Sequence, residues 1–145
     1  MKRRIIVTHG DKKNEIMTNS DEETQKIGEK IAESLKGGEV LALSGDLGAG
    51  KTTFTKGLAK GLGVEEIVTS PTFVLMNVYS ARRGRITEFT HIDCYRLEHS
   101  SDFSGIGAQE YMNDPDVVVA IEWPERIEKI LPKGIMRIFF QVLPE

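Results

Sequence analysis

A glycine-rich segment that follows an apolar run constrains this chain more than any other feature of its sequence. The pattern G-x-x-x-x-G-K-[ST] is met by Gly45, Gly50, Lys51 and Thr52. Its glycines allow successive backbone N–H groups to turn inward around anionic oxygens without a side-chain clash. A helix that begins here would add its unpaired N–H groups and the positive end of its dipole. The segment therefore predicts a phosphate-binding loop.

The flanking residues support this interpretation over a glycine-rich turn that binds nothing. Residues 40–44 form an apolar run typical of a buried strand, and residues 53–62 follow the loop with a helical pattern. Lys51 is expected to reach the β- and γ-phosphates as a mobile point charge. The Thr52 hydroxyl is expected to be one ligand of an octahedral Mg2+ that also binds phosphate oxygens. The residues expected around the phosphates are Asp46, Leu47, Gly48, Ala49, Gly50, Lys51, Thr52 and Thr53.

Length and composition predict one soluble domain. The chain has 145 residues, 39 % of them hydrophobic, which fits a single domain over residues 1–145 with a core of its own. The basic start at residues 2–4 is followed by a short apolar run at residues 5–7, so we expect a cytoplasmic protein with neither a signal peptide nor a membrane span. Cys94 is the only cysteine, which excludes an internal disulfide and a metal site built from several cysteines.

The charge balance limits how the chain could bind nucleic acid. A formal net charge of -3 and a pI near 5.7 argue against a broad RNA-binding surface. Such a surface needs many Lys and Arg side chains to neutralise phosphates. If RNA is involved, a partner is expected to hold it. The basic clusters at residues 2–4 and 82–85 are more typical of a solvated chain end and a turn than of binding patches.

Hydrophobic periodicity predicts alternating strands and helices. Ser20 and Glu23 form a capping box, in which the Glu23 carboxylate is expected to accept from the Ser20 N–H. Apolar residues at a spacing of four then place a stripe along the helix, at Ile27, Ile31 and Leu35. Further helices are expected over 53–62 and 124–130, a helical turn at 109–112, and irregular chain over 10–19. Strands are expected at residues 4–8, 40–44, 66–69, 74–79, 86–92, 117–121 and 135–143.

The expected strands belong to a mixed sheet. Residues 74–79 and 86–92 flank an Arg-Arg-Gly-Arg turn, which indicates an antiparallel hairpin. The unbroken apolar run at residues 117–121 is typical of a central strand that is covered on both faces. Both parallel and antiparallel pairs are therefore expected.

Two carboxylates are placed to complete a phosphoryl-transfer site. Asp93 follows the strand predicted at residues 86–92, and Glu122 follows the apolar run at residues 117–121. The carboxyl ends of strands in open α/β sheets face the ligand crevice, so both side chains could converge on the loop. Each is a candidate for the Mg2+ ligand and for the residue that orients an attacking water. Each could instead be a solvated acid at a strand end.

Other side chains near this region allow competing interpretations. His91 and Asp93 point to the same side of a strand, which suits a His–Asp pair that faces the nucleotide. A zinc site built from His91, Cys94 and His99 would be one ligand short of a structural site. Trp123 could be a core residue or a stacking residue. The chain has no N-K-x-D element for guanine, which favours adenine.

These motifs, taken in order, resemble one family: the TsaE (YjeE) ATPases of bacterial tRNA threonylcarbamoyladenosine biosynthesis. The resemblance runs from the helix that begins at Ser20 to the last strand. Its motifs are the segments 45–53, 70–73 (Ser-Pro-Thr-Phe), 91–97 (His-Ile-Asp-Cys-Tyr-Arg-Leu), 110–111 (Glu-Tyr) and 121–125 (Ile-Glu-Trp-Pro-Glu). The first motif is common to many NTPases, whereas the five together are specific. Residues 100–108 match the family only loosely.

The resemblance implies a fold, a site and partners. The fold is α/β and P-loop NTPase-like, with three layers and a mixed, mostly parallel central sheet. ATP and Mg2+ are the implied cofactors, and Trp123 is expected near the nucleotide. The implied catalytic residues are Lys51, Asp93 and Glu122, and the implied Mg2+ ligands are Thr52, Asp93, Glu122 and Thr72, the last on a switch-like loop. TsaD and TsaB, whose complex attaches the threonylcarbamoyl group to the adenosine beside the anticodon, are the implied partners and would handle the tRNA.

Two other functions fit the same loop. A small-molecule kinase would need an acceptor site and an arginine-bearing lid, for which only the turn at residues 82–85 is available. A non-catalytic module would use bound nucleotide as a conformational latch. For an ATPase, no obvious arginine finger is placed in cis, so hydrolysis by the chain alone is expected to be slow. Arg96 and Arg126 are the candidates for such a finger.

Overall fold

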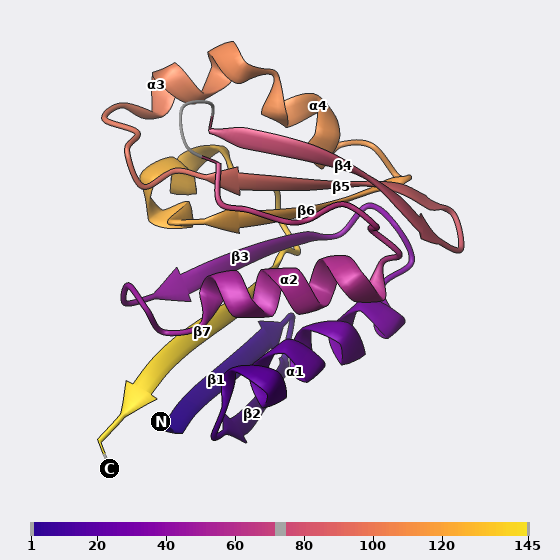
Figure 1. Ribbon diagram of the computed structural model, residues 1–145. Coiled ribbons are helices and arrows are strands. Elements are labelled where there is room, and N and C mark those ends of the chain that lie inside the picture. The colour runs from indigo at the N-terminus through magenta and orange to yellow at the C-terminus, as the bar shows by residue number, and fades with distance from the viewer. Residues whose placement is uncertain (1, 72–74, 145) are drawn as a thin grey trace.

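The computed structural model describes residues 2–71 and 75–144, in which the strands form a central sheet and the helices pack against it (Figure 1). The strands are β1 (Lys2–His9), β2 (Lys12–Thr18), β3 (Val40–Gly45), β4 (Met76–Arg83), β5 (Ile86–Asp93), β6 (Val117–Glu122) and β7 (Met136–Leu143). The helices are α1 (Asp21–Ser34), α2 (Lys51–Gly61), α3 (Ser100–Phe103) and α4 (Ala108–Met112), with the 3-10 helices η1 (Ser104–Ile106) and η2 (Pro124–Ile130). Within these ranges no helix has the length and apolar character needed to cross a membrane.

The strands form a seven-stranded sheet that is parallel in its centre. Their order is β2-β1-β7-β3-β6-β5-β4. β7, β3, β6 and β5 pair parallel with one another, whereas β1, β2 and β4 add antiparallel pairs towards the two edges. The predicted hairpin is the β4–β5 pair. The mixed sheet expected from the sequence is therefore confirmed.

Helices cover both faces of the central strands, so the fold has the three expected layers. α1 and α2 lie side by side over one face (Figure 1). Val118 of β6 belongs to the buried cluster on this side, together with Phe54 of α2. The next residue, Val119, belongs to the cluster on the other face, with Phe103 of α3 and Ile127 of η2. Because side chains alternate along a strand, a run covered on both faces is apolar at every position.

α1 begins at its predicted cap, although only half of the capping box forms. The Glu23 N–H donates to Ser20 Oγ at 3.1 Å. The Glu23 carboxylate, however, accepts from the Asn19 N–H at 2.8 Å and not from the Ser20 N–H. The cap still satisfies one of the N–H groups that a helix start leaves unpaired.

Small residues bring α1 and α2 into close contact. Ile27 and Ile31 of the predicted apolar stripe are only half-buried. A Cβ atom at Gly57 of α2 would lie 1.9 Å from the Gln25 carbonyl oxygen of α1, so no larger residue fits there without a shift of the helices. Ile27 and Ile31 both pack against the core cluster that contains the buried Leu35, the third residue of the stripe. Thr24, Gly28 and Ala32 are the buried residues within α1.

Two predictions of local structure were wrong. Residues 12–18, expected to be irregular, form the edge strand β2, whose first four residues are all exposed and therefore show no alternation. Residues 66–69, expected to be a strand, join no ladder in the described chain. The Tyr79 hydroxyl of β4 instead accepts from the Thr69 N–H and donates to the Thr69 carbonyl, each at 3.3 Å. A side chain thus satisfies backbone groups that a neighbouring strand would otherwise pair.

Gly57→Ala is expected to lower the free energy of unfolding by about 1–3 kcal/mol, the usual range for overpacking. The added methyl group would meet a backbone carbonyl that moves only with α1. Urea denaturation followed by circular dichroism measures the change. Lys56→Ala, at the neighbouring exposed position, is the control and should change the free energy by less than about 0.5 kcal/mol. Equal stability of Gly57→Ala and wild type would contradict the close contact of α1 and α2.

Candidate functional site

The glycine-rich loop joins the carboxyl end of β3 to the first turn of α2. Gly45 has a φ of 136°, and a Cβ atom there would lie 2.3 Å from the Phe140 carbonyl oxygen on β7. Gly50 has a φ of 106° and directly precedes Lys51, the first residue of α2. A residue with a side chain would be strained at both positions. At position 45 its Cβ atom would also collide with the backbone of β7. These two fixed glycines of the sequence pattern therefore set the path of the loop.

The start of α2 is open to an anion, in contrast to the start of α1. α1 has a side-chain cap and acidic residues in its first turn. α2 has a glycine at its cap position, no side-chain cap hydrogen bond and no acidic residue in its first turn. Unpaired N–H groups and the helix dipole favour negative charge at such an end. The first turn of α2 therefore has donors available for phosphate.

Lys51 folds back over the loop. Its Nζ donates to the Gly45 carbonyl oxygen at 2.6 Å and lies 4.2 Å from the centre of the Trp123 ring. Desolvation by burial lowers the pKa of Lys51, and nearby carboxylates, that of Glu122 foremost, act in the opposite direction. A phosphate oxygen is a stronger acceptor for an ammonium group than a neutral carbonyl is. We therefore expect the Lys51 ammonium group to exchange the Gly45 carbonyl for a phosphate oxygen when an anion binds in the loop.

Asp93 and Glu122 lie next to each other at the carboxyl edge of the sheet. They are partners in the parallel register of β5 and β6. Glu122 is 4 % exposed, whereas Asp93 is half-buried and its Oδ1 accepts from the Tyr95 N–H at 2.9 Å. Desolvation by burial raises the pKa of Asp93; the hydrogen bond from Tyr95 opposes this shift and the charge of Glu122 adds to it. The structure thus brings together the two acids predicted from the sequence.

His91 pairs with Glu122, so the predicted His–Asp pair was wrong. His91 Nε2 lies 2.7 Å from Glu122 Oε2, and both residues are buried. His91 and Asp93 do share a face of β5, but the Asp93 carboxylate is bonded to the Tyr95 backbone. The parallel register places Glu122 opposite Asp93 and two residues beyond Ala120, the partner of His91, within reach of the imidazole. His91 therefore fixes the position of the Glu122 carboxylate.

The donor atoms around the loop suit Mg2+ better than zinc. Thr52, Asp93 and Glu122 offer a hydroxyl and two carboxylates, the hard oxygen ligands that Mg2+ combines with phosphate oxygens and water. In the described ranges no three His, Cys, Asp or Glu side chains form a group that could hold a metal ion alone. Desolvation raises the pKa of the buried Cys94 thiol to about 12, which disfavours the thiolate that zinc needs. Thr72, the other predicted Mg2+ ligand, lies outside the described residues.

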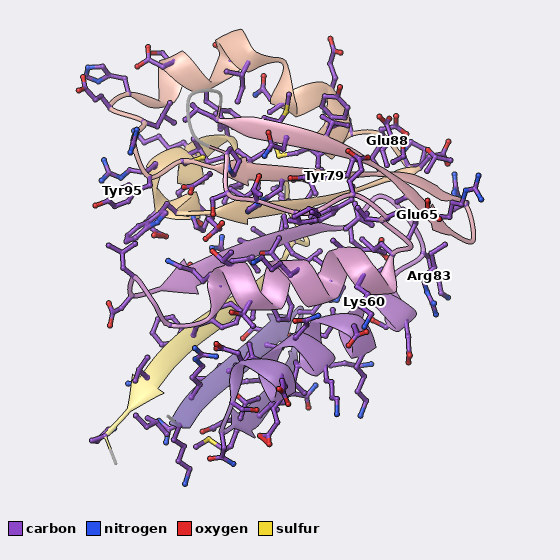
Figure 2. The ribbon with its side chains drawn as sticks, in the orientation of Figure 1. Lys60, Glu65, Tyr79, Arg83, Glu88 and Tyr95 are labelled. Atoms are coloured by element: carbon purple, nitrogen blue, oxygen red, sulfur yellow. The ribbon has the colours of Figure 1, made fainter. Side chains whose placement is uncertain are left out.

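Trp123 turns the chain sharply at the end of β6. Its backbone is left-handed, with φ 57° and ψ 50°, and no other non-glycine residue of the described ranges has a positive φ. Strain of this kind costs about 1–3 kcal/mol and tends to occur at functional sites. The ring packs against the core cluster on one side and lies 5.0 Å from the ring of Tyr95, which Figure 2 labels at this edge of the sheet. Trp123 is thus a core residue that also contacts the lysine of the loop.

A cavity of about 190 Å³ lies at the loop; Lys51, Thr52 and Glu122 line it, whereas Asp93 and Trp123 do not. Among the predicted residues, Ala49 is fully buried in the core beneath the loop and Asp46 is exposed at its start. The candidate arginines Arg96 and Arg126 are exposed and do not line the cavity, and Arg126 donates to the Leu97 carbonyl at 3.3 Å. The lining residues are Arg3, Asp21, Leu47, Gly48, Gly50, Lys51, Thr52, Thr53 and Glu122. Sequence reasoning missed Arg3 and Asp21, which no motif connects to the loop.

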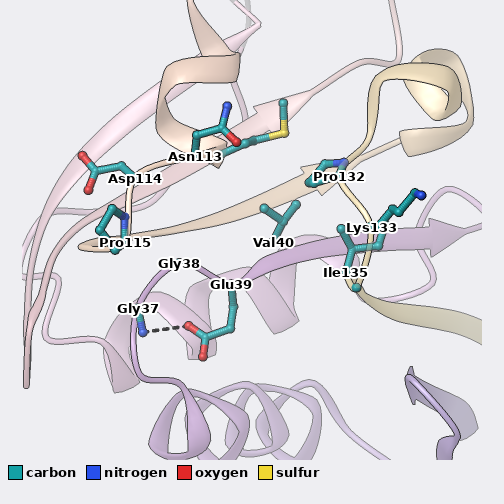
Figure 3. Close-up of a pocket in the computed structure, with 12 residues that line it drawn as sticks. Gly37, Gly38, Glu39, Val40, Asn113, Asp114, Pro115, Pro132, Lys133 and Ile135 are labelled. Atoms are coloured by element: carbon teal, nitrogen blue, oxygen red, sulfur yellow. Dashed lines mark hydrogen bonds between the residues drawn. The ribbon is translucent and has the colours of Figure 1, made fainter.

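A larger cavity of about 470 Å³ lies at the opposite edge of the sheet (Figure 3). It is bounded by the start of β3 and by the segments that precede β6 and β7. Its acidic side chains are bonded within their own turns: Glu39 accepts from the Gly37 N–H at 2.8 Å, and Asp114 from the Asp116 N–H at 2.9 Å. Ligands of open α/β sheets bind outside the carboxyl ends of the strands. The smaller cavity at the loop is therefore the better candidate for a nucleotide.

Comparison with known proteins agrees with this geometry. The family model described as "Threonylcarbamoyl adenosine biosynthesis protein TsaE" matches residues 18–143. The chain belongs to the TsaE family. It is 44 % identical over 129 residues to the tRNA threonylcarbamoyladenosine biosynthesis protein TsaE of Treponema pallidum, covering 89 % of this chain and 92 % of that protein. The TsaE protein of Bacillus subtilis is 43 % identical over 121 residues, covering 83 % and 73 %.

A solved structure supports the same assignment of the fold. The crystal structure of Bacillus subtilis YdiB superimposes with a TM-score of 0.68 at 35 % sequence identity. The match covers 94 % of this chain and 76 % of that one. The resemblance to the TsaE family and the P-loop NTPase-like fold that it implied are therefore confirmed.

Asp93→Asn is expected to stabilise the protein at neutral pH. Burial holds the pKa of the Asp93 carboxyl above its ordinary value of 3.8, so folding disfavours a charge that the unfolded chain carries freely. The resulting loss of folding stability is largest above the pKa of the folded state. It vanishes below the ordinary value of 3.8, because the carboxyl is then protonated in both the folded and the unfolded state. The asparagine oxygen can still accept from the Tyr95 N–H.

Thermal melts at several pH values test this expectation. The melting temperature of Asp93→Asn should exceed that of wild type at pH 7, and the difference should disappear near pH ~3. Asp11→Asn, in the exposed β1–β2 turn, is the control and should show no such pH-dependent gain. A difference that grows as the pH falls would contradict the raised pKa.

Proposed function

We propose that the chain binds ATP with Mg2+ and hydrolyses it, as a subunit that supports a TsaD–TsaB complex in forming threonylcarbamoyladenosine in tRNA. The observation that carries the proposal is the meeting of three features at one edge of the sheet: the open start of α2, Lys51, and the Asp93–Glu122 pair. The relatives named for tRNA threonylcarbamoyladenosine biosynthesis support the pathway. The net charge of -3 supports a role in which the partners hold the tRNA.

In this proposal each side chain has a separate task. The loop N–H groups and Lys51 bind the β- and γ-phosphates. The Thr52 hydroxyl and the Glu122 carboxylate, which His91 holds in place, are the protein ligands for Mg2+. When bound, Mg2+ would supply positive charge against the charge that develops on the phosphate oxygens. Asp93 is the half-buried acid with the raised pKa, and a more basic carboxylate is better suited to orient an attacking water and accept its proton.

The same geometry supports a partner-dependent rate. Arginine fingers stabilise the transition state of phosphoryl transfer, and many are supplied by a second protein. Neither Arg96 nor Arg126 lines the cavity at the loop. We therefore expect the isolated chain to hydrolyse ATP slowly, and the partners to supply or order the missing group.

Steady-state ATPase assays test the proposed roles. Lys51→Ala, Asp93→Ala and Glu122→Ala are each expected to lower the rate by about 100-fold or more, the scale for removing one group that stabilises the transition state. Lys56→Ala, an exposed lysine on the same helix, is the matched control and should keep the wild-type rate. Activity retained by both carboxylate variants would contradict the two-carboxylate mechanism.

TsaD and TsaB from the same organism should raise the wild-type ATPase rate several-fold. No increase in this rate would contradict partner dependence.

Tryptophan fluorescence gives a direct test of nucleotide binding. Trp123 is the only tryptophan of the chain, and Lys51 Nζ lies 4.2 Å from its ring centre. If Lys51 leaves this position for a phosphate, the emission of Trp123 should change as Mg-ADP is added. Lys51→Ala should show little change over the same concentrations. A wild-type spectrum that ADP does not alter would argue against the proposed movement of Lys51.

The structure weakens the kinase alternative. The arginine turn that would serve as a lid lies at the end of the β4–β5 hairpin, and Figure 2 shows Arg83 at the far edge of the sheet from Tyr95. Arg85 of this turn donates to Asp116 Oδ1 at 3.2 Å. A lid at this edge could not close over the loop. The latch alternative remains distinguishable by experiment, because it requires that a non-hydrolysable ATP analogue support full formation of the modified tRNA.

A further inference from the structure

Arg3 of β1 is a buried arginine that lies against the phosphate-binding loop. Its side chain is 4 % exposed and lines the same cavity as Lys51. A Cβ atom at Gly50 would lie 3.2 Å from Arg3 Cδ and Nε and 3.3 Å from Cζ. The Arg3 side chain therefore lies beside Gly50, the last residue of the loop before α2, and lines the same cavity.

The known contacts of Arg3 do not account for its burial. Nη1 pairs with Asp21 Oδ1 at 2.7 Å and donates to Thr24 Oγ1 at 3.1 Å. Asp21 is 67 % exposed, so solvent screens much of this ion pair. Nε is buried and has no hydrogen-bond partner within the described residues. A buried charge with an unused donor is costly unless a further partner compensates it.

The sheet order shows which part of a nucleotide could be that partner. β6 and β5, which carry Glu122 and Asp93, lie on one side of β3, whereas β1 lies on the other side, beyond β7. Arg3 therefore approaches the loop from the side opposite the two carboxylates. A nucleotide whose γ-phosphate faces Asp93 and Glu122 would extend its α-phosphate and nucleoside towards Arg3. Thr53, two residues after Lys51, also lines this cavity.

We propose that Arg3 binds the α-phosphate of the nucleotide held by the loop. A guanidinium group has five N–H donors in a fixed plane and matches phosphate oxygens well. With Nη1 directed to Asp21 and Thr24, Nε is a donor that remains for the ligand. Arg3 lies outside residues 18–143, which the family model matches, so it is an addition to the family motifs. The inference rests on the proposed binding of ATP.

Phosphorothioate nucleotides test the contact at the level of single oxygens. Dissociation constants of ADP and of the Rp and Sp diastereomers of ADPαS are measured by calorimetry without Mg2+. Sulfur is a poor acceptor, so the diastereomer that places sulfur towards Arg3 should bind wild type more weakly than the other. Arg3→Met should bind ADP about 10- to 100-fold more weakly, the scale of a lost charged hydrogen bond. In this variant the affinity ratio of the two diastereomers should fall towards one.

Arg4→Met is the matched control. Arg4 is the next residue of β1, its side chain lies on the other face of the sheet, and its Nε pairs with Glu15 at 2.6 Å. This variant loses the same charge and should keep the wild-type affinities and ratio. If Arg3→Met does not fold, Arg3→Lys provides the same measurement, because lysine keeps the charge but lacks the planar donors and should also shift the ratio towards one.

The possible outcomes separate this inference from the proposed function. An unchanged diastereomer ratio in the Arg3 variant would overturn the contact even if all affinities fell, because a loosened loop weakens every ligand equally. Equal binding of both diastereomers by wild type would overturn it as well. Absence of ADP binding by wild type, with Lys51→Ala no different, would instead overturn the proposed function.

Discussion

The parallel pairing of β3, β6 and β5 is the interaction on which the candidate site depends. This ladder puts Leu43 beside Glu122, and Glu122 beside Asp93. Three strand ends therefore meet at one edge, and the loop leaves β3 two residues beyond Leu43. Because a shift of one residue would turn each side chain to the other face, the same register that fills both cores also directs both carboxylates to the side of α2.

The charges gathered at this edge are held at a cost to the fold. Burial lowers the pKa of Lys51 and raises that of Asp93, so for both groups folding disfavours the charged form. Trp123 adds a left-handed backbone next to Glu122. A ligand that brings phosphate to Lys51 and a cation to the acids would relieve these penalties and stabilise the folded state. Such an arrangement is typical of sites that trade stability for binding.

The sequence predicted those parts of the structure that are encoded locally. The glycine pattern, the Ser20 cap and the two-sided apolar run of β6 each depend on neighbouring residues, and each is found where expected. The pairing of His91 with Glu122 depends instead on the register of two strands, which local patterns do not determine. β2 was missed because an exposed edge strand shows no periodicity, and residues 66–69 were misassigned because the hydroxyl of Tyr79 replaces a strand partner.

The same distinction explains why Arg3 could not be found from motifs and why it belongs to the site. Arg3 and Gly50 are far apart in the sequence, and the strand order β1-β7-β3 brings them to the same cavity. Thr18 and Thr24 are joined through their hydroxyls at 2.8 Å, and Thr24 accepts from Arg3. The β1–β2 hairpin and the start of α1 are thus linked by one polar network, and its arginine lines the cavity at the loop. Because such networks fix side-chain positions only when every strand and helix in them is packed, this wall of the cavity is a product of the tertiary fold.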